Sequence, residues 1–201
     1  MTPATINKDW LGETVAIFAS GPSMSVEIAE SLRGQCRVIA INNQSFDCAP
    51  WADVIWASDH KWWKQYYQTV KDLPGRKLMV RRGLIFPGVE FLDYSQRVHD
   101  ERASFISCGG NSGYAAISLA AKYGAARVLL YGFDMRPIGN RFRRHDYPAN
   151  LNSRPRFKHW IPKFVLLADE LKRLGTDVVN CTPGSALKCF RFERVDLRRA
   201  S

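Results

Sequence analysis

The feature that most constrains the fold is a repeated order of a short apolar run, a few small or polar residues, and an amphipathic stretch. Short runs rich in β-branched and apolar residues are typical of buried strands. They occur at 14–19, 37–41, 53–57, 78–80, 105–107, 127–131 and 178–180. Helical patterns follow several of them, at 25–32, 61–67, from 112 and at 159–174. The alternation predicts an α/β fold with a mostly parallel sheet and helices on both faces.

The chain is long enough for one such sheet but short for two domains. It has 201 residues, of which 46% are hydrophobic, so we expect residues 1–201 to form a single Rossmann-like domain. Residues between 81 and 100 contain Gly and Pro and match no clear pattern. No apolar run is long enough to span a membrane, and the N-terminus does not resemble a signal peptide. We therefore expect a cytoplasmic protein.

A helix entrance made of small residues precedes the strand at 127–131. Asn111, Ser112 and Gly113 open the helix, and the strand ends in Gly-Phe-Asp at 132–134. A helix start presents unpaired backbone N–H groups and a partial positive charge, which suits a phosphate. Open α/β sheets bind ligands at the carboxyl ends of their strands. Both features predict an anion site here, although the same residues also suit an ordinary αβ unit.

Polar and small residues follow other strands as well. The first strand runs into Ser-Gly-Pro-Ser at 20–23, which is neither a phosphate-binding P-loop nor a dinucleotide-binding G-x-G-x-x-G. Ser23 can cap the next helix or donate to a phosphate, and an Asn pair has donors and acceptors for a ribose or base edge. Each motif is also a common turn. Together they predict one nucleotide-binding crevice, with these candidates: Ser20, Gly21, Pro22, Ser23, Asn42, Asn43, Ser58, Ser112, Gly113, Gly132, Phe133 and Asp134.

The positive charge is unevenly distributed along the chain. The net charge is +10, and residues 136–173 contain ten basic against three acidic residues. Prolines and polar residues predict a long basic loop at about 135–158, and a short basic tail ends the chain. We expect Arg141, Arg143 and Arg144 to contact phosphate or a polyanionic acceptor, nucleic acid being the obvious one. A solvated basic surface is the alternative.

Two histidines are candidates for a general base, His145 inside the basic loop and His159 at the start of the late helix. The five cysteines are odd in number, widely spaced and without a C-x-x-C pair, which indicates neither a disulfide framework nor a zinc site. A metal site stays open as an alternative, although the spacing matches no ligand pattern. Its candidate ligands are Asp59, His60, Asp134, His145 and Asp146.

Five ordered motifs carry a resemblance that spans about Thr14 to Leu187. They are V-A-I-F-A-S-G-P-S, I-N-N-Q-S-F, the N-S-G-Y helix with its Y-G-F-D strand, H-W-I-P-K-F, and C-T-P-G-S-A-L. In this set the chain resembles the bacterial lipooligosaccharide sialyltransferases. Their wider relatives include Maf-type flagellin glycosyltransferases and 6-hydroxymethylpterin diphosphokinases. The chain is similar above all to small phage and prophage proteins of this group.

The resemblance implies roles for particular residues. The segment 20–23 would bind the nucleotide phosphates, Asn43 the nucleoside, and Ser112 with Gly113 a phosphate or the cytidine part. His159 corresponds to the histidine that serves as general base. The sialyltransferases have an asparagine at position 20 and leaving-group tyrosines in the loop after Gly-x-Asp. Here Tyr147 would substitute for those tyrosines, or Arg143 and Arg144 would neutralise the leaving phosphate.

The resemblance therefore predicts a nucleotide-sugar-dependent glycosyltransferase, of phage origin and with a polyanionic acceptor such as modified DNA. Such an enzyme uses a nucleotide sugar as substrate and needs no metal or other cofactor. One alternative is an ATP-dependent diphosphokinase of the pterin kinase type, which would require Mg²⁺. Another is a non-catalytic nucleotide- or nucleic-acid-binding module. The aromatic cluster at 62–67 is typical of core packing or of a subunit interface in a homo-oligomer.

Overall fold

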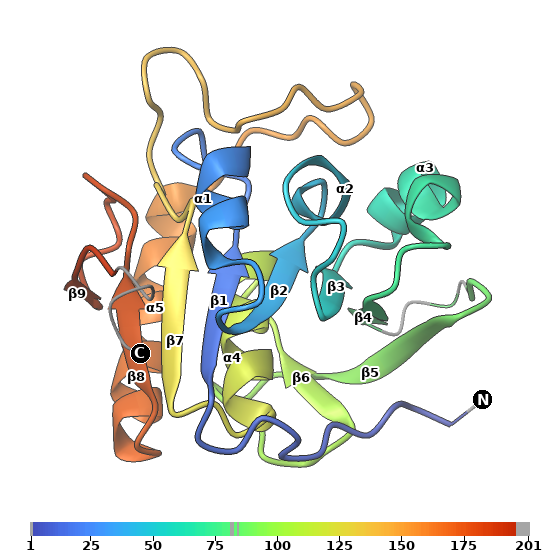
Figure 1. The fold of residues 1–201 in the computed structure, drawn as a ribbon, viewed down its shortest axis with the longest axis horizontal. Coiled ribbons are helices and arrows are strands. Elements are labelled where there is room, and N and C mark those ends of the chain that lie inside the picture. Colours follow the sequence, from blue (N-terminus) through green and yellow to red (C-terminus); the bar gives the residue numbers. More distant parts are fainter. Residues whose placement is uncertain (1, 81–82, 84, 196–201) are drawn as a thin grey trace.

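The computed structural model describes residues 2–80, 83 and 85–195. The basic residues of the expected tail at 198 and 199 lie outside the described residues. In this part of the chain nine strands form one sheet in the order β6-β5-β4-β3-β2-β1-β7-β8-β9, and every neighbouring pair is parallel. The predicted α/β, Rossmann-like fold is confirmed (Figure 1).

The described elements have the following bounds. The strands are β1 (Thr14–Phe18), β2 (Arg37–Ile41), β3 (Val54–Ala57), β4 (Arg76–Val80), β5 (Val89–Ser95), β6 (Phe105–Ser107), β7 (Arg127–Tyr131), β8 (Asp177–Asn180) and β9 (Arg191–Phe192). The helices are α1 (Val26–Leu32), α2 (Gln44–Asp47), α3 (His60–Val70), α4 (Ser112–Lys122) and α5 (Phe157–Arg173). None of these helices is long and apolar enough to cross a membrane.

Helices cover both faces of the sheet, as the alternation predicts. Successive side chains of a strand point to opposite faces. In β1, Val15 and Ile17 belong to the core that includes residues of α4 and α5, whereas Ala16 and Phe18 pack with residues of α1. In Figure 1, α1 and α4 accordingly lie on opposite sides of β1. Farther along the sheet, Ile55 and Ala57 of β3 pack against the indoles of α3.

Three short or irregular elements were not predicted. The strand β5 lies in the segment that matched no pattern. The pattern is missing because exposed and buried residues are mixed along this strand. The two-residue β9 extends the sheet beside β8. The polar run after β2 forms the single helical turn α2. In addition, α5 begins at Phe157, so the loop after β7 ends slightly earlier than expected.

The strand order reverses direction between β1 and β7. From β1 the chain builds β2 to β6 outward on one side, and β7 then pairs with the other side of β1, with Phe18 beside Tyr131. The helices that follow β1 and β7, α1 and α5, therefore pack on opposite faces of the sheet. This is the topological switch point at which open α/β sheets bind ligands. In Figure 1 the long loop after β7 arches over this edge, above α1 and α2.

Candidate functional site

A cavity of about 270 Å³ lies at the carboxyl ends of the strands. It is lined by loops that follow β1, β2, β3 and β7, by the start of α4, by the long loop after β7 and by the first turn of α5. A larger hollow of about 800 Å³ beside His99 and Lys122 lies at the amino ends of the strands instead. Nine of the residues predicted to bind the nucleotide or phosphate line the cavity: Ser20, Gly21, Asn42, Ser58, Ser112, Gly113, Gly132, Phe133 and Arg143.

Glycines bring the loops after β1 and β7 into direct contact. The Gly21 N–H donates to the Gly132 carbonyl oxygen at 2.9 Å. A Cβ on Gly21 would overlap both that oxygen and the Asp134 carboxylate. Gly132 has a φ of +72°, which a side chain disfavours. The first loop therefore needs glycine at 21, and its backbone forms one wall of the cavity.

Ser23 and Asp134 hold this wall in place from behind. The Ser23 hydroxyl and backbone N–H donate to the Asp134 carboxylate at 2.9 and 3.3 Å. Burial raises the pKa of Asp134, and the Ser23 donors oppose that rise. Neither residue lines the cavity, and nor does Pro22. The N-cap of α1 is Ser25, whose hydroxyl accepts from Ile28 N, so Ser23 bonds to a carboxylate instead of capping the helix.

The two asparagines after β2 have different surroundings. Asn42 lines the cavity, has a φ of +53°, and its buried Oδ1 has no hydrogen-bond partner among the described residues. Such strain at a non-glycine residue is frequent at functional sites. Asn43 is buried, and its Oδ1 accepts from Trp62 Nε1 at 2.7 Å. The structure thus places Asn42 in the cavity, and it places the Asn43 side chain against α3.

Hydrogen bonds at the start of α4 differ from the sequence expectation. The Asn111 Oδ1 accepts from the backbone N–H groups of Gly113 and Tyr114, at 2.7 and 3.2 Å. Two of the N–H groups that were expected to be unpaired are therefore capped. The side chain facing the cavity is Ser112, whose Oγ lies 2.6 Å from Ser58 Oγ. This hydroxyl pair can offer both a donor and an acceptor to a ligand.

Of the three loop arginines, Arg143 lines the cavity. Its guanidinium donates to Asn152 Oδ1 and to the Ser153 carbonyl, at 3.2 and 2.6 Å, and burial lowers its pKa. Arg144 instead anchors the loop, because its backbone N–H donates to the Ser20 carbonyl at 2.9 Å. Arg141 is exposed in a tight turn with Ile138. Only the Arg143 side chain is therefore in place to meet a ligand in the cavity.

The remaining candidates for catalysis lie outside the cavity lining. His145 Nε2 is 3.0 Å from Asp47 Oδ2 in α2, and burial lowers the His145 pKa while Asp47 opposes this. Tyr147 packs against the core around α3, and burial raises its pKa to about 12. His159 is exposed on the first turn of α5, beside the cavity residue Trp160.

Three aromatic residues of the cavity were not predicted as site residues. Phe142, Phe157 and Trp160 follow one another along its wall, with ring centroids 6.2 Å apart for the first pair and 6.0 Å for the second. The sequence interpretation assigned Trp160 to the periodic core pattern of the late helix. The sequence did contain a signal for this position. Trp160 stands in the first helical turn after a long loop, and such a turn is only partly covered by the sheet. Neighbouring ring planes are tilted by 43° and 76°, so each ring on its own can offer a face or an edge to a nucleobase.

Acidic groups are few at the cavity. Asp59 lines it, but the side chain is exposed and caps α3 by accepting from Lys61 N at 2.9 Å. Within the described residues, no three His, Cys, Asp or Glu side chains come together in a way that could hold a metal ion.

The sequence matches no protein family and no curated protein. The structure is similar to that of the sialyltransferase CstII from Campylobacter jejuni, which was solved in complex with a substrate analogue, cytidine-5'-monophosphate. The TM-score is 0.56 and the identity 14%, over 93% of this chain and 87% of that chain. This likeness confirms that the chain has a sialyltransferase-like fold.

Proposed function

We propose that this protein is a nucleotide-sugar-dependent glycosyltransferase whose nucleotide binds in the cavity at the switch point. The observation that carries the proposal is the cavity itself. It lies between β1 and β7 of a sialyltransferase-like fold and is lined by hydroxyl, amide and guanidinium groups. Aromatic rings beside convergent polar groups are typical of small-molecule sites.

The lining suggests how a nucleotide would be held. The unpaired Asn42 Oδ1 would accept from an amino or hydroxyl group of the nucleoside. The Ser58 and Ser112 hydroxyls and the Arg143 guanidinium would donate to phosphate oxygens. The rings of Phe157 and Trp160 would cover the base or the sugar.

In the proposed reaction, an acceptor hydroxyl attacks the anomeric carbon of the donor. His159 takes the proton of that hydroxyl as the new C–O bond forms. The bond from the anomeric carbon to the phosphate oxygen breaks, and Arg143 stabilises the charge of the departing phosphate. His159 is exposed beside the cavity residue Trp160, which suits an acceptor that arrives from solvent.

A ligand panel and a matched variant test this function. One of CMP, UDP and GDP should raise the Tm selectively, and the corresponding nucleotide sugar should be hydrolysed or transferred. His159→Ala should lower turnover about a hundredfold, the usual worth of a general base, with the donor still bound. His99→Ala is the control histidine, since His99 lines the hollow at the other end of the strands. Unchanged turnover in His159→Ala would show that the base is another group, and magnesium-dependent AMP release from ATP would replace the proposal with a diphosphokinase.

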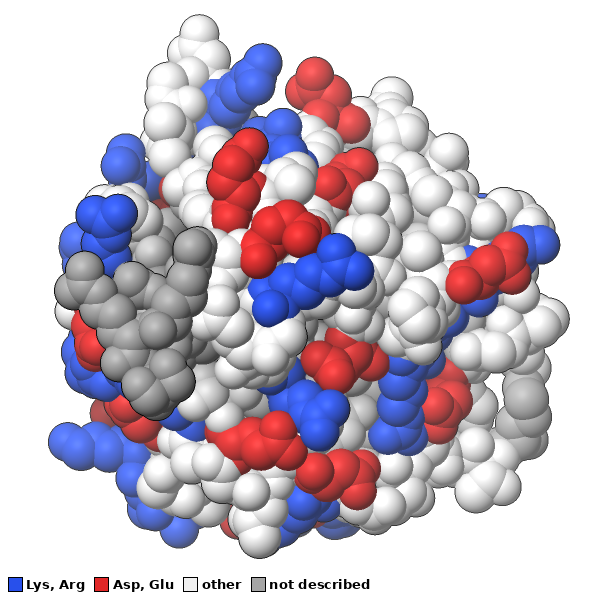
Figure 2. Space-filling model, in the orientation of Figure 1, with Lys and Arg blue, Asp and Glu red and all other residues white. Residues whose placement is uncertain are grey.

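The acceptor is proposed to be polyanionic, such as the modified DNA of a phage. Arg141, Arg154 and Arg156 are exposed in the loop that adjoins the cavity. Figure 2 shows basic and acidic side chains interspersed on the α1 face, so the excess charge does not form one uniform patch there. A DNA acceptor requires binding that weakens steeply with salt. Salt-sensitive DNA binding without turnover of any donor would instead indicate a non-catalytic module.

A further inference from the structure

Two hydrogen-bond donors from α5 meet beside Gly110 at one side of the cavity. Gly110 lies in the turn between β6 and α4 and lines the cavity. A Cβ placed on it would lie 3.8 Å from Trp160 Nε1 and 3.8 Å from Lys163 Nζ. Residues spaced three apart on a helix are neighbours on its surface. The fold thus brings an indole N–H and an ammonium group to one point from a distant part of the sequence.

Both donors lack a protein acceptor among the described residues. Trp160 Nε1 is buried and has no hydrogen-bond partner there. Lys163 is half-buried and forms none of the ion pairs that the described residues make. A buried, unpaired donor is unusual in a folded protein and calls for an explanation. An acceptor supplied by a ligand would satisfy both groups.

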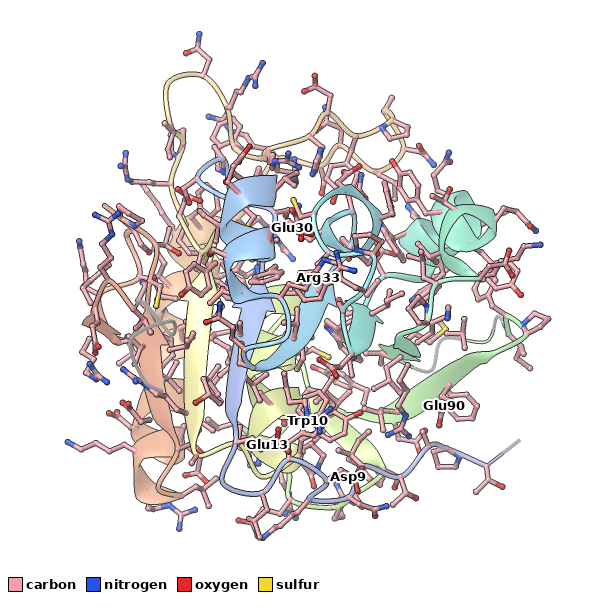
Figure 3. The ribbon with its side chains drawn as sticks, viewed as in Figure 1. Asp9, Trp10, Glu13, Glu30, Arg33 and Glu90 are labelled. Atoms are coloured by element: carbon pink, nitrogen blue, oxygen red, sulfur yellow. The ribbon has the colours of Figure 1, made fainter. Side chains whose placement is uncertain are left out.

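No carboxylate of the cavity lining pairs with the Lys163 ammonium group beside Gly110. Asp59, the acidic residue of the lining, caps its own helix from an exposed position. Figure 3 labels Asp9, Glu13 and Glu90, which lie toward the end of the molecule opposite the loop after β7. Gly110 itself has no side chain to fill the space, and its φ of +79° makes one unfavourable. The space beside it is therefore open, basic and suited to an anion.

We propose that Lys163 and Trp160 form an anion-binding subsite that holds a phosphate or carboxylate of the substrate beside Gly110. This inference rests on the proposed function, since it assumes that a nucleotide-linked substrate occupies the cavity. Ser112 follows two residues after Gly110 and also lines the cavity. The bound anion would thus lie near the Ser58 and Ser112 hydroxyls.

The first test measures dissociation constants for variants of the two donors. Lys163→Met should raise the Kd of a charged ligand about tenfold, as expected for the loss of one charge-assisted hydrogen bond. Lys163→Arg should restore most of the affinity, and Trp160→Phe should weaken binding by a smaller factor while keeping an aromatic ring. Lys158→Met is the matched control, because Lys158 is a more exposed lysine of the same helix and is not among the groups within 4 Å of the Gly110 Cβ position.

Two ligand pairs identify the anion. If Lys163 binds the nucleotide phosphate, Lys163→Met weakens the binding of CMP and leaves the binding of cytidine unchanged. The same comparison applies to whichever nucleotide and nucleoside the protein prefers. If Lys163 binds a carboxylate of the transferred sugar, Lys163→Met weakens the binding of UDP-glucuronate. The affinities for UDP-glucose and for the nucleotide then stay unchanged. Equal affinity of Lys163→Met and the unsubstituted protein for every charged ligand overturns the subsite and leaves the proposed function standing.

An NMR readout separates the subsite from the function. The chain has six tryptophans, and Trp160→Phe identifies the indole N–H signal of Trp160. Inorganic phosphate or acetate should shift this signal in the unsubstituted protein and in Lys158→Met, but not in Lys163→Met. A shift without any nucleotide binding would overturn the proposed function and keep the anion site. No shift with phosphate, acetate or any charged nucleotide would overturn the anion site.

Discussion

At the scale of single residues, the close approach of the loops after β1 and β7 decides which residue types fit in the cavity wall. Gly21 has no space for a Cβ because the Asp134 carboxylate and the Gly132 carbonyl occupy it. The Ser-Gly-Pro-Ser turn predicted Gly21 as a nucleotide-binding residue, and its contact with the loop after β7 was not expected. The bond from Ser23 to Asp134 was not expected, because nothing in a local motif shows that a residue more than a hundred positions away supplies the acceptor.

We predict that Gly21→Ala lowers the free energy of unfolding by about 2 kcal/mol or more, because the new methyl group must displace a buried carboxylate. Urea unfolding measures the change. Gly34→Ala is the control, since Gly34 has positive φ but open space around it, and about 1 kcal/mol is expected there from strain alone. Equal losses for both variants would show that the contact with Asp134 is not tight.

At the scale of elements, the long loop is fastened to α2 and to the first loop at neighbouring positions. Arg144 N–H donates to the Ser20 carbonyl, and the His145 ring contacts Asp47 and Gln44. The sequence predicted the loop and its charge. It could not predict this attachment, because α2 is a single turn without helical periodicity, and the histidine was interpreted as a catalytic candidate.

We predict that acid pH loosens the loop. The His145 pKa lies below its usual value, so the folded state favours the neutral ring. The stability that this ring contributes is fully present above about pH 6.5 and is lost as the pH falls through the lowered pKa. Trypsin cleavage at Arg141, Arg143 or Arg144 should therefore become faster as the pH is lowered from 7.5 to 5.5, after correction for the activity of trypsin itself.

Two substitutions check the cause. His145→Gln should remove most of the acceleration between pH 7.5 and 5.5, because glutamine does not titrate. Asp146→Asn should leave most of it, because the exposed Asp146 is the weakest of the influences on the His145 pKa and makes no hydrogen bond or ion pair with α2 among the described residues. A loop that is cleaved at the same rate across this range in the unsubstituted protein would contradict the prediction.

At the scale of the whole molecule, the cavity exists only because the strand order reverses between β1 and β7. It joins the ends of several strands, α4, α5 and the long loop in one place. Parallel pairing guarantees that the strand ends meet at one edge. The direction of each side chain at that edge depends on its tertiary partners.

The two asparagines after β2 provide a direct test at this scale. Asn42→Gly should raise the Kd of the preferred nucleotide about tenfold and lower the Tm less than Asn43→Ala does, because glycine adopts the positive φ of Asn42 and the Asn42 Oδ1 accepts no hydrogen bond from the described residues. Asn43→Ala should lower the Tm by several degrees, because it leaves Trp62 Nε1 without its acceptor. Calorimetric titration and thermal unfolding measure the two effects. Loss of affinity confined to Asn43→Ala would reverse the assignment.

The sequence by itself determined the parallel α/β sheet, the covering helices and the edge at which the polar residues gather. Those features follow from local periodicity and from short, continuous apolar runs, which are typical of strands buried on both faces. Only the tertiary structure decided which of the gathered residues face the cavity. Asn42 and Ser112 do so, Asn43 and Ser23 bind buried partners, and Trp160 joins the wall from α5. The reason is that a side chain's partner at a strand end comes from distant segments, which local patterns do not encode.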